Sequence, residues 1–199
     1  MPRAGLTPDR VVAEAERMVD DVGLHELTLA ALAARFGVRQ PSLYKHVASL
    51  GALEHQVAIR AKAELGDVLG RAAIGLSRGD AISAMALAYR QWARAHPGRY
   101  EAAQRAPAPG DIEDVAASDA VVRVVAAVIE RYDLHEADVV DAIRAVRSAL
   151  HGFVSLESSG GFGLPTSIDR SFERLVGALT DALTNWRTAS GGAGEAPAR

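Results

Sequence analysis

Apolar residues recur along this chain at steps of three and four, which is the spacing of one buried face of an α-helix. The first such stripe follows Thr7, a candidate N-cap, has Pro8 in its first turn and stops at Gly23. No stretch alternates apolar and polar residues with the β-branched enrichment of an exposed strand. The pattern therefore predicts an all-α fold of nine helices.

The other eight helices follow from the same stripes and from the Gly, Pro and Thr residues that punctuate them. They are expected from Thr28 to Gly37, about Arg39 to Val47, about Ser49 into the 60s or early 70s, Ile82 to His96, around Tyr100, about Ile112 to Tyr132, about Glu136 to Ser158 and about Ser167 to Arg187. Apolar residues cover most of the circumference of the helix at 112–132, so we expect it to be buried at the centre of the body.

Three segments are expected from these elements: a head at 5–65, a body at 78–188 and a Gly/Ala/Pro-rich disordered tail at 189–199. The 49% apolar content of the 199 residues supports a packed core. The absence of cysteine excludes disulfides and thiolate metal sites, and fits a cytoplasmic protein. No apolar run is long enough for a membrane span, and with six scattered histidines we expect no metal, no cofactor and no enzyme.

Charge is distributed unevenly along the chain. The net charge is −3, yet the segment 35–50 has no Asp or Glu and carries Arg35, Arg39, Lys45 and His46. A solvated face is the alternative interpretation of so few cations. The spacing of the residues around them instead favours contact with nucleic acid.

The stretch from Leu27 to His46 has the spacing of a helix-turn-helix. Two short helices that cross steeply need a turn residue without Cβ constraints, and Gly37 supplies it, while Val38 fills the apolar gap beside it. Pro41 fits only the first turn of a helix and so fixes where the second one starts. The predicted recognition helix presents a polar, cationic face suited to the major groove of duplex DNA.

The residues at the start of this helix can read bases. Gln40 can pair bidentately with adenine, and Arg39 can reach guanine or a phosphate. Pro41 can contact a thymine methyl group, and Ser42 can bond a base edge or a phosphate.

The remaining polar residues of the segment can hold the DNA backbone. We expect Tyr44, Lys45 and His46 to contact phosphates, which position a protein without reading sequence. Thr28, at the N-terminus of the preceding helix, can bond phosphate through its hydroxyl and the free backbone N–H groups.

Residues 7–60 resemble the TetR family of transcriptional regulators. The resemblance rests on LTLAALAARFGV at 27–38, PSLYKHV at 41–47 and Leu53. It implies a DNA-binding head of four helices and a body that binds a small molecule and dimerises. A weaker resemblance, through Trp92 and the pair His151-Gly152, points to one subfamily of such bodies. Leu50 and Ala30 depart from the Lys and Arg that family members often carry, so base reading should rest more on Arg39 and Gln40, and affinity on Lys45, Arg3 and Arg10.

The last two helices carry near-heptad apolar seams. A helix-turn-helix of this kind needs two heads spaced by about one turn of DNA, which favours a homodimer over ordinary core packing. The predicted dimer interface consists of Val139, Ile143, Val146, Leu150, Ile168, Phe172, Leu175, Leu179, Leu183 and Trp186.

The family resemblance also implies a pocket for a small apolar or aromatic ligand. Its candidates, each of which could equally be core, are Met85, Tyr89, Trp92, Tyr100, His151, Phe153 and Phe162. We therefore expect a repressor that a ligand releases from a palindromic operator. Two alternatives stay open: a helical ligand-binding or protein-interaction module without a DNA role, and an activator of the same fold. The Ser42-x-x-Lys45 pattern of acylating enzymes lacks its partner motifs here.

Overall fold

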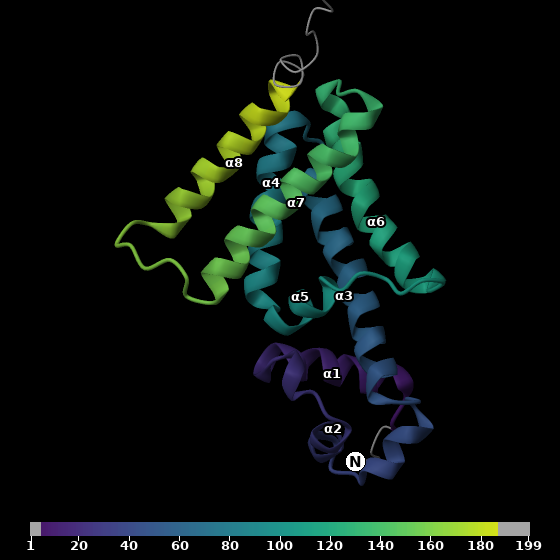
Figure 1. The fold of residues 1–199 in the computed structure, drawn as a ribbon. Coiled ribbons are helices and arrows are strands. Elements are labelled where there is room, and N and C mark those ends of the chain that lie inside the picture. Colours follow the sequence, from purple (N-terminus) through teal and green to yellow (C-terminus); the bar gives the residue numbers. More distant parts are fainter. Residues whose placement is uncertain (1–4, 187–199) are drawn as a thin grey trace, which may run out of the picture. The chain divides into compact units, whose positions relative to one another are not determined.

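The computed structural model describes residues 5–186, and within this range the chain is helical, with no strand (Figure 1). The α-helices are α1 (Pro8–Val22), α2 (Leu29–Phe36), α3 (Leu50–Ala73), α4 (Arg78–Ala95), α5 (Pro97–Ala103), α6 (Ile112–Ile129), α7 (Glu136–Ser158) and α8 (Ile168–Thr184). Three short 3₁₀ helices lie between them: η1 (Leu24–Glu26), η2 (Gln40–Lys45) and η3 (Glu130–Tyr132). With η2 counted beside the eight α-helices, the expected all-α, nine-helix architecture is confirmed. Arg3, Arg187 and the tail predicted at 189–199 lie outside the described residues.

The helix ends follow local rules that are visible in the sequence. The Thr7 hydroxyl accepts the backbone N–H of Arg10 at 3.3 Å, and the Thr28 hydroxyl accepts that of Ala31 at 3.1 Å. Both threonines therefore cap helices as predicted. Gly37 ends α2 in the left-handed region, at φ 65° and ψ 32°, a conformation that costs a residue with a Cβ about 1–2 kcal/mol.

The helices form two compact units. Unit 1 contains the described residues 5–67 and 91–121, and unit 2 contains 68–90 and 122–186. The long helices α3, α4 and α6 each contribute residues to both units. None of the helices in the described range is long and apolar enough to span a membrane.

The core of unit 1 joins α1, α2, η2 and the first half of α3. Its centre consists of fully buried side chains, among them Val11, Val19, Leu32, Leu43 and Leu53. α5 packs on α1 through Gly98, where an added Cβ would lie 2.0 Å from the Val19 carbonyl oxygen. Only glycine permits this approach of two helix backbones.

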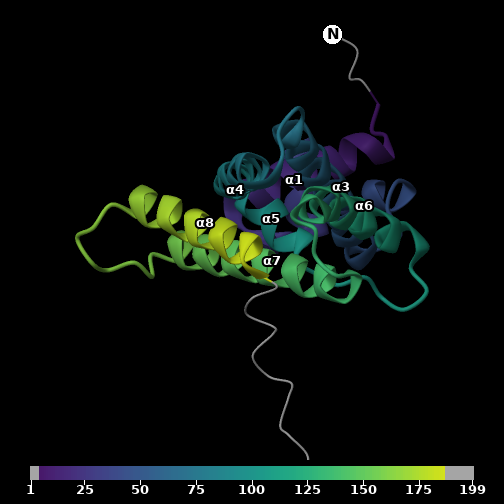
Figure 2. The same ribbon diagram turned by 90° about the horizontal axis from the view of Figure 1, so that it is seen from above.

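Unit 2 contains the antiparallel pair α7 and α8, which lie side by side in both ribbon views (Figures 1 and 2). Arg90 of α4 joins both helices: its guanidinium donates to Glu157 of α7 at 2.6 and 2.7 Å and to Asp169 at the start of α8 at 2.7 Å. The hydrogen bond to Glu157 raises the pKa of Arg90. The same guanidinium lies 4.8 Å from the centroid of the Phe172 ring. A buried, bidentate ion pair of this kind fixes the register of the two helices.

The structure corrects the prediction that the helix at 112–132 is buried at the centre. Val128 and Ile129, at the end of α6, are buried, but Ile112 is 84% exposed and Val122 is 43% exposed. A helix that is apolar around its circumference offers apolar residues to solvent when neighbours pack against one side only.

Candidate DNA interface

The predicted recognition segment lies at one end of unit 1, and it is a 3₁₀ helix. η2 covers Gln40–Lys45, with Arg39 as its extended N-cap residue and His46 at its C-cap. The prediction of a helix at this place is confirmed; it ends at Lys45, slightly before the expected end at about Val47. Pro41 lies in the first turn, as its missing N–H requires.

One side of η2 is anchored in the core of unit 1. Leu43 is fully buried, Val47 is buried just beyond the helix, and Val38 packs partly buried against the same core. Backbone N–H groups on both sides close tight turns: Val38 donates to Ala33 at 3.0 Å, and His46 donates to Leu43 at 2.8 Å. η2 therefore has a defined orientation against α2.

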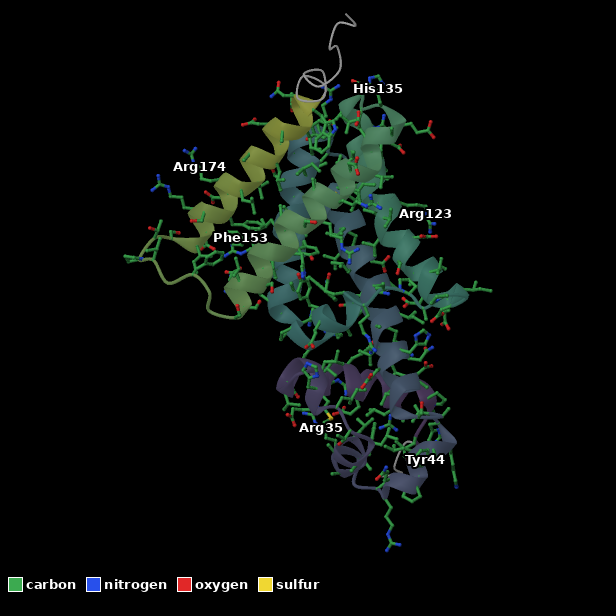
Figure 3. All side chains as sticks on the ribbon, in the orientation of Figure 1. Arg35, Tyr44, Arg123, His135, Phe153 and Arg174 are labelled. Atoms are coloured by element: carbon green, nitrogen blue, oxygen red, sulfur yellow. The ribbon has the colours of Figure 1, made fainter. Side chains whose placement is uncertain are left out.

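The opposite side of η2 is exposed and carries most of the predicted DNA-binding residues. In and beside η2 the exposed side chains are Arg39, Gln40, Pro41, Tyr44 and Lys45, and the half-buried ones are Ser42 and His46. Thr28, the N-cap residue of α2, is exposed as well. Tyr44 is labelled at this end of unit 1 in Figure 3. The Gln40 side-chain amide lies 3.4 Å from the Tyr44 hydroxyl, a long contact that places the two polar tips beside each other. The surface thus offers amide, hydroxyl and cationic groups together, which is the chemistry of major-groove and phosphate contacts.

The cations of this segment divide into two kinds. The guanidinium of Arg35 pairs with the carboxylate of Asp21 and lies 3.4 Å from that of Glu14, both on α1. The hydrogen bond to Asp21 raises the pKa of Arg35. Arg39 and Lys45, by contrast, form no ion pair among the residues that the structure describes. In the sequence Arg35 stands within the basic run, because its acidic partners lie on another helix.

Arg10, which the sequence suggested as a phosphate contact, donates to the Gly5 carbonyl at 2.8 Å. Thr28 uses its hydroxyl oxygen as the α2 cap, so its O–H remains the group that could donate to a phosphate. Leu50 and Ala30 occupy the first turns of α3 and α2, and neither offers a charge to DNA.

The predicted pocket residues fall in both units. Trp92 and Tyr100 belong to unit 1, where the Trp92 ring lies 5.6 Å from that of His96. In unit 2 the rings of Phe153 and Phe162 lie 4.8 Å apart. Met85 and Tyr89 are buried in unit 2, and His151 is half-buried there. The Nε1–H of Trp92 is buried and has no hydrogen-bond partner among the described residues.

The predicted dimer residues are partly used by the fold of a single chain. Val146, Leu150, Phe172 and Leu183 are buried within unit 2. The half-buried members of the set are Val139, Ile143, Ile168, Leu175, Leu179 and Trp186. Val140 and Leu156 of α7, which lie off the heptad seam, are each 50% exposed.

Comparisons with known proteins place this arrangement in a family. Residues 82–179 match the family model of the tetracyclin repressor-like C-terminal domain. The chain is 41% identical over 158 residues to an uncharacterised HTH-type transcriptional regulator of Mycobacterium tuberculosis, covering 79% of this chain and 72% of that one. It is 35% identical to a further uncharacterised HTH-type transcriptional regulator, from Bacillus subtilis, covering 81% and 84%.

Solved structures share the fold. A TetR variant of Acinetobacter baumannii, in complex with minocycline, superposes with a TM-score of 0.69 at 22% identity, covering 92% of this chain and 99% of that chain. BioQ, with its natural double-stranded DNA operator, gives a TM-score of 0.64 at 24% identity, covering 90% and 99%. With the helix-turn-helix in unit 1 and the sequence matches over both halves, the chain belongs to the TetR family of transcriptional regulators.

Proposed function

We propose that this regulator binds a palindromic operator through η2 and its flanking residues, and that it acts as a repressor. The observation that carries this proposal is the exposed face of η2, where Arg39 and Lys45 stand without ion-pair partners among the described residues, beside the amide of Gln40. BioQ, which shares the fold, is known in complex with its operator. The proposal places the protein in the cytoplasm, because its relatives are transcriptional regulators of Mycobacterium tuberculosis and Bacillus subtilis, whose DNA lies there.

The proposed contacts divide into two kinds. Arg39 and Gln40 read base edges, with Pro41 and Ser42 beside them, because an exposed amide or guanidinium can form bidentate hydrogen bonds with a base. The groups proposed to hold phosphates are Thr28, Tyr44, Lys45 and His46. Without a basic residue at positions 30 or 50, sequence discrimination depends chiefly on η2.

The repressor acts as a homodimer, because a pair of recognition elements is needed for the two halves of a palindrome. We place the dimer contact on α7 and α8. The half-buried apolar residues Ile143, Leu175 and Leu179 support this placement, since they still expose part of their surface in a single chain. The Arg90 ion pairs hold α7 and α8 together before a partner arrives.

A small apolar or aromatic ligand is proposed to release the operator. The buried, unpartnered Nε1–H of Trp92 supports a ligand that brings a hydrogen-bond acceptor, because an unsatisfied buried donor costs about 1–3 kcal/mol. The TetR variant of similar fold is known with the ligand minocycline. Release requires that the ligand binds the DNA-free conformation more tightly.

Selection from random-sequence duplex DNA with the purified full chain tests the proposal. We expect an enriched palindrome whose half-sites lie about one helical turn apart. The double variant Arg39→Ala/Gln40→Ala should lose enrichment at specific positions of each half-site. A helical module without a DNA role would enrich no sequence. An activator of the same fold would enrich the same palindrome, and transcription from that site would then rise when the protein is added.

A further inference from the structure

Three potential metal ligands from distant parts of the sequence meet on unit 1. His55 lies on the second turn of α3, Asp111 precedes α6, and Asp114 lies in the first turn of α6. One ligand atom from each of the three residues lies within 4.8 Å of the other two. We propose that His55, Asp111 and Asp114 form a binding site for a divalent transition-metal ion.

The separation of the first two groups suits a shared ion. The Nε2 atom of His55 lies 3.4 Å from the Oδ2 atom of Asp111. That is longer than the usual N–H···O hydrogen bond. Two ligands that each lie about 2.1 Å from a tetrahedral zinc ion are themselves about 3.4 Å apart. The pair therefore has the spacing of two ligands of one metal.

Each carboxylate is held by one oxygen, which leaves the other for an ion. Asp111 uses Oδ1 to accept the backbone N–H of Asp114 at 3.1 Å, and its Oδ2 faces His55. Asp114 uses Oδ1 to accept from the ammonium of Lys62. Metal-binding carboxylates are commonly fixed by such outer hydrogen bonds, which orient the ligand before the ion arrives.

The local charge favours a cation. Lys62 and the positive end of the α6 dipole offset part of the charge of Asp111 and Asp114, but two carboxylates outweigh them. Asp114 is only 4% exposed, whereas His55 and Asp111 are half-buried, so an ion could enter from the solvent side. One imidazole with two carboxylates suits Zn²⁺, Mn²⁺, Fe²⁺, Co²⁺ or Ni²⁺ better than Ca²⁺, and leaves a position for water.

Bound metal would join α3 to the start of α6. α3 begins five residues after the end of η2, so the ion would act on the helix that directly follows the DNA-reading element. The sequence gives no hint of the site, because its ligands come from positions 55, 111 and 114 and form no local motif.

Calorimetric titration of the metal-free full chain with ZnCl₂ at pH 7.5, where an ordinary histidine is neutral, tests this site. We expect one ion per chain, with an affinity that falls at least about tenfold in His55→Ala and in Asp111→Asn. Asn at 111 keeps an acceptor for the Asp114 N–H, so the second variant preserves the α6 cap. Zn²⁺ should also raise the Tm of the native chain and not that of His55→Ala.

His25→Ala is the matched control, because His25 Nε2 lies 3.3 Å from Glu101 Oε1 in an exposed pair that belongs to no group of three potential metal ligands among the described residues. This variant should bind Zn²⁺ as the native chain does. The proposal is overturned if the native chain shows no saturable binding, if His55→Ala binds unchanged, or if His25→Ala loses the site. No DNA enters this experiment, so its result is independent of the proposed operator binding.

Discussion

Gly98 of α5 lies so close to Val19 of α1 that a Cβ atom on Gly98 would stand 2.0 Å from the Val19 carbonyl oxygen. The obstacle is backbone rather than a flexible side chain, so it cannot move aside without displacing a helix. Gly98→Ala should therefore lower the free energy of unfolding, measured by urea denaturation, by about 1–3 kcal/mol or more. Gly51→Ala is the control, since its nearest neighbouring atom is Ser49 Oγ at 3.9 Å. The control should be neutral or gain up to about 1 kcal/mol. Equal stability of Gly98→Ala and the native chain would contradict this packing.

Glu16 of α1 makes the stability of unit 1 depend on pH. Burial raises the pKa of this carboxyl; Arg60 and Arg99 oppose the rise, whereas Glu64 and Asp20 add to it. A raised pKa in the folded state means that the contribution to stability is full at pH below the unfolded pKa and is lost as the pH rises through the folded pKa. At neutral pH the charged Glu16 therefore opposes folding.

Glu16→Gln should accordingly be more stable than the native chain at pH 7. The difference should shrink as the pH approaches about 4, where the native carboxyl is protonated as well. Urea unfolding of both proteins at several pH values measures this. A variant that is less stable than the native chain at pH 7 would show that the two arginines outweigh burial.

Lys62 and Asp114 form a buried ion pair between α3 and α6, with side chains only 5% and 6% exposed. Asp114→Asn removes one charge and leaves the Lys62 ammonium buried without a counter-ion. We expect a loss of about 3–5 kcal/mol, measured by urea unfolding in EDTA so that metal plays no part. The double variant Lys62→Met/Asp114→Leu should recover most of that loss, because two apolar side chains can be buried without a charge that needs a partner. If Asp114→Asn has the same free energy of unfolding as the native chain, the pair is exposed to water, which contradicts its burial.

The proposed dimer contact is tested by a charge on its half-buried surface. Leu179→Asp on α8 should shift the chain from dimer to monomer in sedimentation velocity at micromolar concentration. Val122→Asp on α6 is the control: Val122 is 43% exposed and lies outside α7 and α8, so this variant should stay dimeric. A native chain that sediments as a monomer, alone and on operator DNA, would contradict the dimer itself.

Much of the fold could be predicted because its signals are local. Caps at Thr7 and Thr28 and the left-handed Gly37 depend on a few neighbouring residues, and the structure has each of them in place. Other features depend on partners distant in sequence. Arg35 forms an ion pair with Asp21 of α1, which lies 14 positions earlier in the chain. The inner side of the 3₁₀ helix η2 is fixed by the packing of Leu43 into the core.

The exposure of α6 also depends on residues that are distant in sequence. Its many valines led to a prediction of burial, yet the packing of other helices decides which of its sides is covered. The candidate metal ligands are an extreme case, since Asp111 and His55 meet only through the fold.

The most direct test of DNA recognition by η2 is the salt dependence of operator binding. Lys45 has no ion-pair partner among the described residues, whereas Arg35, ten positions earlier, is paired to Asp21. Fluorescence anisotropy at several salt concentrations gives the slope of the logarithm of the DNA association constant against the logarithm of the salt concentration. This slope is negative, and its magnitude decreases by about 0.9 for each phosphate contact that is lost. Lys45→Ala should reduce the magnitude of the slope by about one. Arg35→Ala and Arg123→Ala should keep the native slope, since Arg35 is paired to Asp21 and Arg123 is an exposed residue of α6 outside the proposed interface. A native slope in Lys45→Ala, or equal losses in all three variants, would contradict the proposed interface.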